Sequence, residues 1–423
     1  MKKRVLVLAV IALISVSGAM LFAAGEQESD QKVVKFWGFY DLTDTADSRA
    51  VVMAETIASF QEDTGITVEY EQVAWDQMDN KVALVARSGG DMPDVIQGAA
   101  ENITGWVNAG ALLDIKDQIS KLDWYSDLDP FEKGMFEKDG KRYALGLFIS
   151  GGNYYFDLAS FPNGLPVTAD EWLAEGARLK AEGKYALTGF MGKGFGGAAV
   201  SQGYAPFFWS NGGSVFNAAG EPNWATPQNY EVVEWVREMY ANGYIPDAAI
   251  TGDWTASEIP FTSGNAAAVR GGSWSFLYME GLEERYNKGE VTIADPPAFG
   301  AQGYVFANSE TFAVAKNAEN VDNAIAFIDY FVSDDDRLAA WANAQYGMPT
   351  TMSAQKAEIF SNQFYVDTAA NLFSNGHVSE TSPYYNECTD ALATVLQEIM
   401  INPSLDIETE LTELQAEMLR KYW

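Results

Sequence analysis

The chain has very few of the side chains that most often bind zinc or act as nucleophiles. Its 423 residues include one histidine, His377, and one cysteine, Cys388. A zinc site usually needs three or four histidine or cysteine ligands, so such a site is excluded in practice. A Ser-His-Asp triad or a Cys-His pair would have to use His377, which lies in an acidic, tyrosine-rich stretch, and we interpret both residues as structural. We therefore expect no metal and no cofactor.

Basic side chains are also scarce. The chain has 27 lysines and arginines against 59 aspartates and glutamates, a formal charge of −32. Nucleic acids and anionic membranes both need a basic surface, so we expect neither as a partner. With 48% hydrophobic and 20% charged residues the chain is typical of a folded globular protein, long enough for two domains. Chemistry that uses only carboxylates remains open.

Long apolar runs do not occur after the first few tens of residues. Near the N-terminus, three basic residues (2–4) precede an apolar run (5–16) and a group of small residues (23–25), which is typical of a secretory signal peptide. The alternative is a membrane anchor, but serine and glycine interrupt the segment and make it a poor spanning helix. No cysteine near the cleavage site could carry a lipid. We predict a signal peptide over 1–24, a polar leader over 25–32, and a soluble periplasmic product.

The first part of the mature chain alternates between strand and helix patterns. Apolar or alternating segments predict strands at 33–37, 66–70 and 94–97, and apolar residues at helical spacing predict helices around 53–60 and 78–85. This order predicts a parallel sheet covered by helices. A further strand is expected within 304–315, a helix within 324–344, and a helix near the C-terminus.

In such a sheet, ligands bind beyond the carboxyl ends of the strands. The loops that follow the first three predicted strands, together with the strand ends, supply the candidates Trp37, Tyr40, Asp41, Trp75, Gln97, Glu101 and Asn102. Trp37 has an alternative role as the last core residue of its strand, and Glu101 as a solvated loop acid.

Several segments, in their order along the chain, resemble the extracytoplasmic solute-binding proteins of carbohydrate ABC transporters, the group that includes the maltose-binding proteins. The segments are "FQEDTGITVEYEQVAWDQMDNKVALVARSGGDMPDVIQG", "WVNAGALLDI", "DGKRYALGL", "GLPVTADEWLAEGARLK", "NGGSVFNAAGEPNW", "FTSGNAAAVRGGSW" and "ETFAVAKNAENVDNAIAFIDYFVSDDD". The resemblance covers nearly all of the mature chain. It implies an α/β, two-lobed periplasmic-binding-protein (Venus flytrap) fold of type II, with a hinge of two or three crossings.

The same resemblance implies how the chain is divided. Lobe one would take residues 31–147 plus 296–335, and lobe two 148–295 plus 336–423. The crossings would fall near 147–151, 295–297 and 333–336. The ligand would bind between the lobes, and the loaded protein would meet the permease subunits of a membrane transporter.

A sugar offers a face of C–H groups, which aromatic rings cover, and a rim of hydroxyls, which polar side chains orient. Trp274, in "GGSW", matches the place where the family has a stacking aromatic, although it could instead be a core residue at a strand end. Arg270 could bind hydroxyls or pair with an acid. By resemblance the further candidates are Tyr204, Trp209, Glu310, Tyr346 and Tyr384.

The sequence therefore predicts a monomeric binding protein that captures a sugar, expected to be an oligosaccharide, and performs no covalent chemistry. The alternative is a secreted glycoside-active enzyme that uses two carboxylates at a separation of roughly 5–10 Å. No local motif indicates such a pair.

Overall fold

The first of two main sheets has the strand order β2-β1-β3-β12-β6 in the computed structural model, which describes residues 32–300 and 302–423. Its strands are β1 (Val33–Gly38), β2 (Thr67–Gln72), β3 (Val95–Ala99), β6 (Ala144–Gly146) and β12 (Glu310–Val314). β1 pairs in parallel with β2 and β3, as the alternating pattern predicts, while β12 runs antiparallel to β3 and β6. The predicted signal peptide and all of the leader except Lys32 lie outside the described residues.

Two helices connect the parallel strands of this sheet. They are α1 (Ser48–Thr64) and α2 (Trp75–Ser88). α1 begins at Asp47, whose side chain accepts a hydrogen bond from the backbone N–H of Arg49, and ends at Gly65, which has the left-handed conformation (φ 68°) that glycine adopts without strain. The apolar face of α1 packs against the sheet, with Phe60 in the same buried cluster as Phe36 of β1.

The second sheet has the order β14-β11-β7-β9-β8, and two further strands pair with β7. Its members are β7 (Phe148–Asp157), β8 (Tyr185–Thr188), β9 (Ala266–Gly272), β10 (Val291–Ala294), β11 (Val305–Asn308), β13 (Met348–Pro349) and β14 (Gly376–Val378). A separate hairpin joins β4 (Glu137–Lys138) to β5 (Lys141–Arg142) through Asp139 and Gly140, both of which have positive φ. The largest buried apolar cluster surrounds the second sheet.

The chain passes between the two sheets three times. The first passage joins β6 to β7 at Leu147, and the second joins β11 to β12 at Ser309. The third follows two helices, α13 (Val321–Val332) and α14 (Asp335–Ala344), which pack in the core of the first sheet before the chain reaches β13. The second and third passages therefore lie later in the chain than the crossings near 295–297 and 333–336 that the resemblance implies.

Two predicted elements are each divided. The sequence predicts one strand within 304–315, but this stretch forms β11 and β12 in different sheets, because Ser309 interrupts the pairing. The sequence predicts one helix within 324–344, but this stretch forms α13 and α14, because Asp334 has an extended backbone and caps α14 by accepting from the N–H of Arg337.

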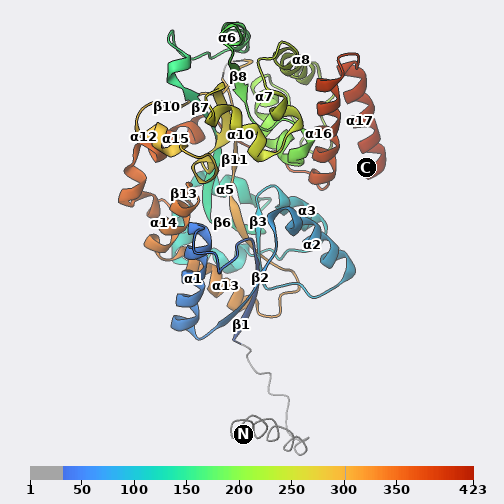
Figure 1. The fold of residues 1–423 in the computed structure, drawn as a ribbon. Coiled ribbons are helices and arrows are strands. Elements are labelled where there is room, and N and C mark those ends of the chain that lie inside the picture. Colours follow the sequence, from blue (N-terminus) through green and yellow to red (C-terminus); the bar gives the residue numbers. More distant parts are fainter. Residues whose placement is uncertain (1–31, 301) are drawn as a thin grey trace, which may run out of the picture. The chain divides into compact units, whose positions relative to one another are not determined.

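The remaining helices lie around the two sheets (Figure 1). They are α3 (Asn102–Asn108), α4 (Lys116–Ile119), α5 (Pro130–Phe136), α6 (Ala169–Ala181), α7 (Ala205–Ser210), α8 (Pro227–Ala241), α9 (Asp247–Thr251), α10 (Trp254–Thr262), α11 (Ser275–Tyr278), α12 (Leu282–Asn287), α15 (Gln363–Asn375), α16 (Tyr385–Ile401) and α17 (Ile407–Tyr422). Short 3₁₀ turns occur at Asp123–Asp127, Leu158–Ser160, Lys193–Phe195, Ala354–Lys356 and Glu358–Ser361, and a π-helix at Ala199–Tyr204.

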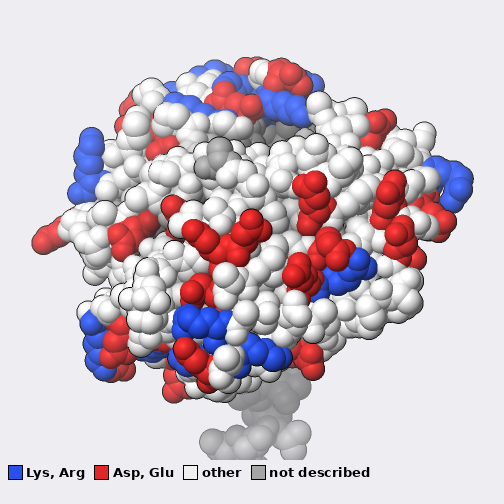
Figure 2. All heavy atoms as spheres, turned by 90° about the horizontal axis from the view of Figure 1, so that it is seen from above, with Lys and Arg blue, Asp and Glu red and all other residues white. Residues whose placement is uncertain are grey.

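The surface carries charged side chains of both signs. On the face that Figure 2 shows, acidic and basic side chains are interspersed among large uncharged areas. Within the described part of the chain, no helix combines the length and the apolar character that crossing a bilayer requires.

Candidate functional site

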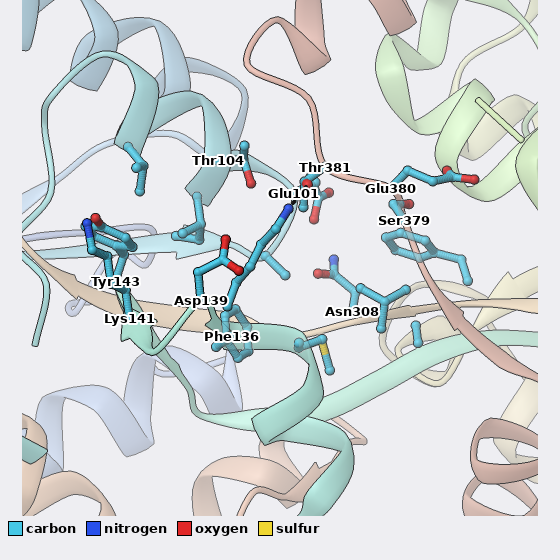
Figure 3. A pocket seen from close by; sticks show the side chains of 18 residues that line it. Glu101, Thr104, Phe136, Asp139, Lys141, Tyr143, Asn308, Ser379, Glu380 and Thr381 are labelled. Atoms are coloured by element: carbon cyan, nitrogen blue, oxygen red, sulfur yellow. Dashed lines mark hydrogen bonds between the residues drawn. The ribbon is translucent and has the colours of Figure 1, made fainter. Parts of the chain in front are cut away.

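A pocket of about 330 Å³ lies where the carboxyl end of β3 meets segments of the second sheet. It is bounded by α3, by the end of α5 and the β4–β5 hairpin, by β11, and by the segment that follows β14 (Figure 3). The lining residues are Ala100, Glu101, Ile103, Thr104, Val107, Met135, Phe136, Lys138, Asp139, Lys141, Tyr143, Phe306, Ala307, Asn308, Val378, Ser379, Glu380 and Thr381. About half of the lining residues are apolar and the others carry polar or charged side chains, so the pocket offers both kinds of contact that a small-molecule site uses.

Glu101 is the polar residue whose surroundings most favour a ligand. It directly precedes α3, and burial raises the pKa of its carboxyl to about 7, against the opposing effects of its own backbone and of Asn308. The Oε2 atom of Glu101 is buried and has no hydrogen-bond partner among the described residues. A buried carboxylate oxygen without a donor is costly, so a ligand that donates a hydroxyl there would be favoured.

Glu380 lines the pocket from the segment after β14. Its Oε1 accepts a hydrogen bond of 2.8 Å from Nε1 of Trp209, and its Oε2 is buried without a partner in the described structure. Burial raises the pKa of this carboxyl. The indole of Trp209 stacks on the ring of His377, with centroids 4.1 Å apart. Trp209, a predicted ligand contact, thus holds a lining residue and is not itself among the lining residues.

The β4–β5 hairpin brings two lysines to the pocket. Nζ of Lys138 lies 3.4 Å from Oγ1 of Thr381, to which it donates, so this side chain reaches from the hairpin to the segment after β14. Lys141 lines the pocket beside Tyr143 (Figure 3). These cations and the two glutamates give the pocket charged groups of both signs.

Tyr40 and Gln97, which the strand pattern places at one edge of the sheet, lie together with Glu310, a candidate by resemblance, in a separate buried network. The hydroxyl of Tyr40 donates to Glu310 at 2.8 Å, and Nε2 of Gln97 donates to the same carboxylate at 2.8 Å. Gln345, which the sequence does not single out, donates to Tyr40 at 2.7 Å. Burial raises the pKa of Glu310 to about 7. Both carboxylate oxygens have donors, so this network is complete without a ligand.

Four other candidates of the first sheet do not line the pocket. Trp37 is buried beneath Nζ of Lys81, which lies 3.9 Å from its ring centroid. Trp75 is 50% exposed at the start of α2. Asp41 is exposed and accepts from the backbone and hydroxyl of Thr43, which lowers its pKa. Asn102 accepts from the N–H of Ala99 at 3.3 Å and so shapes the turn into α3.

The candidates of the second sheet are likewise outside the pocket. Trp274 is partly buried after β9, with its ring directly against Gly272, where an added Cβ would lie 2.4 Å from it. The ring of Tyr384 stacks on that of Tyr422, with centroids 4.6 Å apart. The hydroxyl of Tyr346 donates a hydrogen bond of 3.3 Å to Oε2 of Glu283. Arg270 and Tyr204 are buried in the second sheet's core, and Arg270 has no acidic partner among the described residues.

Of the residues that line this pocket, the sequence therefore names Glu101 but not Asn308 or Glu380. Asn308 ends β11, immediately before the passage that the pattern does not show, and its Oδ1 accepts from the N–H of Ser309 at 2.7 Å. Glu380 stands in an irregular acidic stretch without periodicity. No local signal identifies either residue, because each becomes part of the site only when distant segments meet.

Known proteins match both the sequence and the fold. Residues 41–338, well over half of the chain, match the model of the bacterial extracellular solute-binding proteins. The maltodextrin-binding protein MdxE of Bacillus subtilis is 23% identical over 72% of this chain and 72% of its own length. Two solved structures match with a TM-score of 0.76, each covering 92% of this chain and 99% of its own: the GacH receptor of Streptomyces glaucescens, 16% identical and solved unliganded and with acarbose, and an ABC transporter solute-binding protein of Thermotoga lettingae, 17% identical and bound to α-D-tagatose. These matches confirm the predicted fold class, and the chain belongs to the bacterial extracellular solute-binding protein family.

Proposed function

We propose that this protein is the sugar-binding component of an ABC importer, which captures a carbohydrate and delivers it to a membrane permease. The observation that carries the proposal is the buried, unpartnered oxygen of Glu101 in a pocket where β3 ends and α3 begins. Sugar hydroxyls are donors of the kind that this oxygen lacks, and hydrogen bonds to an ionised carboxylate are among the stronger ones.

The relatives support a carbohydrate as the ligand, since their names and titles mention maltodextrin, acarbose and α-D-tagatose. The pocket volume, about 330 Å³, is near the lower end of the roughly 300–1,000 Å³ of small-molecule sites. This size favours one or two sugar rings in the pocket itself. A longer sugar would have to extend beyond the pocket.

We further propose that the two sheets belong to two lobes joined at the three passages. Lobe one would contain 33–147 and 309–346, and lobe two 148–308 and 347–423, with the boundaries at the passages of the chain. A ligand that makes better contacts in the closed arrangement would shift the population of a hinge toward closure.

The N-terminal segment supports an exported protein. Its basic start and apolar run favour a signal peptide that is removed, which leaves the binding protein free in the periplasm as a monomer. A mature chain that begins near residue 25 when isolated from cells would support this part of the proposal.

Native mass spectrometry of the mature protein with a panel of maltodextrins, other oligosaccharides and monosaccharides tests the function. We expect a one-to-one adduct at the mass of the intact sugar and no shorter products in solution. Shortened sugars that accumulate with time would overturn the proposal and favour the carboxylate enzyme. If no sugar of the panel binds, a carbohydrate is not the ligand.

A variant separates a specific site from surface adhesion. Glu101→Ala should lose the adduct, whereas Glu62→Ala, which removes an exposed glutamate from α1, should keep it. Equal adducts in both variants would show that the sugar binds elsewhere.

A further inference from the structure

Arg270 is a buried cation in the core of the second sheet. It lies on β9, its side chain is 2% exposed, and burial lowers the pKa of its guanidinium to about 10, so that it is still charged at neutral pH. No carboxylate is among the groups that influence this pKa; apart from burial, the groups that do are the phenols of Tyr154 and Tyr204. The usual reason for burying an arginine, an ion pair, is therefore absent from the described structure.

The contacts of the guanidinium satisfy only part of it. Nη2 donates to the backbone carbonyl of Phe190 at 3.1 Å, and the ring of Phe190 lies 4.3 Å from the guanidinium carbon. Nε and Nη1 are buried and have no hydrogen-bond partner among the described residues. A cation over a ring face recovers part of the cost of burial, but it does not accept N–H bonds.

Two buried tyrosines near Arg270 also have hydroxyls without hydrogen-bond partners in the described structure. Tyr154 is directly opposite Arg270 in the antiparallel pairing of β7 and β9, so the two side chains share one face of the sheet. Tyr204 follows Gly203, where an added Cβ would lie 3.8 Å from Nη1 of Arg270. Both rings are buried, at 1% and 0% exposure, and both hydroxyls lack partners within the described chain.

These groups have too many donors to satisfy one another. Nε and Nη1 of an arginine carry three N–H groups, and each tyrosine adds one O–H. Even if both phenolic oxygens accepted bonds from the arginine, their own hydrogens and one N–H would still need an acceptor. The cluster therefore requires an acceptor from outside itself, and its positive charge favours one that is negative.

We propose that Arg270, Tyr154 and Tyr204 form a binding site for a small monovalent anion of the halide type, for which chloride is the physiological candidate. A monatomic anion accepts bonds from every side, which suits donors that come from three different elements, β7, β9 and the π-helix Ala199–Tyr204. It would neutralise the buried charge and fasten the π-helix to the sheet. π-Helices occur often at functional sites. The site is separate from the pocket of Glu101, since none of its residues lines that pocket.

The direct test is a crystal of the full mature protein grown with sodium bromide. We expect an anomalous peak within hydrogen-bond distance of Nε or Nη1 of Arg270 and of both tyrosine hydroxyls. A well-ordered water at this place, with bromide bound only elsewhere or not at all, would overturn the proposal.

Thermal unfolding gives a second test in solution. Replacing methanesulfonate by chloride at constant ionic strength should raise the melting temperature by about 2 °C and then reach a plateau, because an anion that binds only the folded state stabilises it. Tyr154→Phe should weaken this response, and Arg270→Met should abolish it. Tyr155→Phe is the matched control, since its hydroxyl already donates to the carbonyl of Gly272 at 2.8 Å, and it should keep the response. A response that is the same in all four proteins would contradict the site.

Discussion

Glu101 and Glu310 are neighbours at one edge of the first sheet but differ in their partners. Glu310 pairs with Ala99, the last residue of β3, and Glu101 follows Ala99 by two positions. Burial raises the pKa of each carboxyl to about 7. Tyr40 and Gln97 supply donors to Glu310, whereas Oε2 of Glu101 has none in the described structure.

The difference separates two reasons for burying an acid. The hydrogen bonds of the Glu310 network are all made within the protein, so they contribute to the stability of the folded state. The carboxylate of Glu101 is left incomplete beside a pocket, so its remaining hydrogen-bond capacity is available to a ligand. A raised pKa alone would rank the two residues as equal candidates, and the pattern of partners distinguishes them.

The largest effect is expected on stability, at Glu310. Glu310→Ala leaves the hydroxyl of Tyr40 and the amide of Gln97 buried without their acceptor, and should lower the free energy of unfolding by about 2–4 kcal/mol. Urea unfolding followed by tryptophan fluorescence measures it. Glu310→Gln keeps the shape and one acceptor and should cost less. If the alanine variant is as stable as the wild type, the network is not structural.

The next effect is expected on binding, at Glu101. Glu101→Ala should weaken the affinity for the bound sugar by about ten- to a hundredfold, which corresponds to about 1.5–3 kcal/mol for a hydrogen bond to a charged group. Its unfolding free energy should stay close to that of the wild type, because Oε2 leaves no donor behind and the substitution removes the cost of burying the carboxyl. Titration calorimetry with the sugar identified by mass spectrometry gives the affinity. Unchanged affinity with lost stability would reverse the roles of the two glutamates.

The pH dependence of stability should follow from both carboxyls. Because the folded protein keeps these protons up to about pH 7, whereas an unfolded chain releases them near pH 4.3, the unfolded state binds fewer protons between these values. Stability should therefore fall as pH rises through this window, by up to about 1.4 kcal/mol per pH unit for each group, and level off above it.

Urea unfolding between pH 5 and 8 measures this slope. The chain's charge of −32 also disfavours the compact state as pH rises, so the comparison is with Glu310→Gln, which keeps nearly all of that charge. The variant should show the smaller slope. Parallel curves would mean that Glu310 does not hold its proton in the folded protein. Sugar affinity should move the opposite way and rise toward pH 8, because hydroxyl donors prefer the ionised form of Glu101.

Much of the first sheet could be predicted because its signals are local. Residues 33–99 alternate between strand and helix patterns, and Gly65 and Gly89 mark helix ends by their left-handed backbone. Glu101 could be named because it follows a strand that ends at a sheet edge. The passages at Ser309 and after Ala344 could not be placed, because the apolar pattern continues through them and only the pairing partners change.

The opposite wall of the pocket could not be predicted for a related reason. Asn308 and Glu380 line the same pocket as Glu101 although they lie more than 200 residues away in the chain, and neither stands in a periodic pattern. The positions of the aromatic candidates also depend on packing between distant segments. Tyr204 and Tyr384 match family segments, but packing uses Tyr204 in the core and Tyr384 against Tyr422.

The smallest effect is expected at Glu380, which is intermediate between the two glutamates because one of its oxygens has a donor and the other has none. Trp209→Phe preserves a ring against His377 but removes the N–H that orients this carboxylate. We expect sugar affinity to fall about threefold and stability to fall by about 1 kcal/mol, as for the loss of one hydrogen bond. Trp235→Phe is the control, since its indole donates to the carbonyl of Ala169 at 3.0 Å, away from the pocket. It should lose similar stability and keep full affinity. If the two variants bind the sugar equally well, Glu380 belongs with Glu310 as a structural acid, and the ligand is held on the side of Glu101 alone.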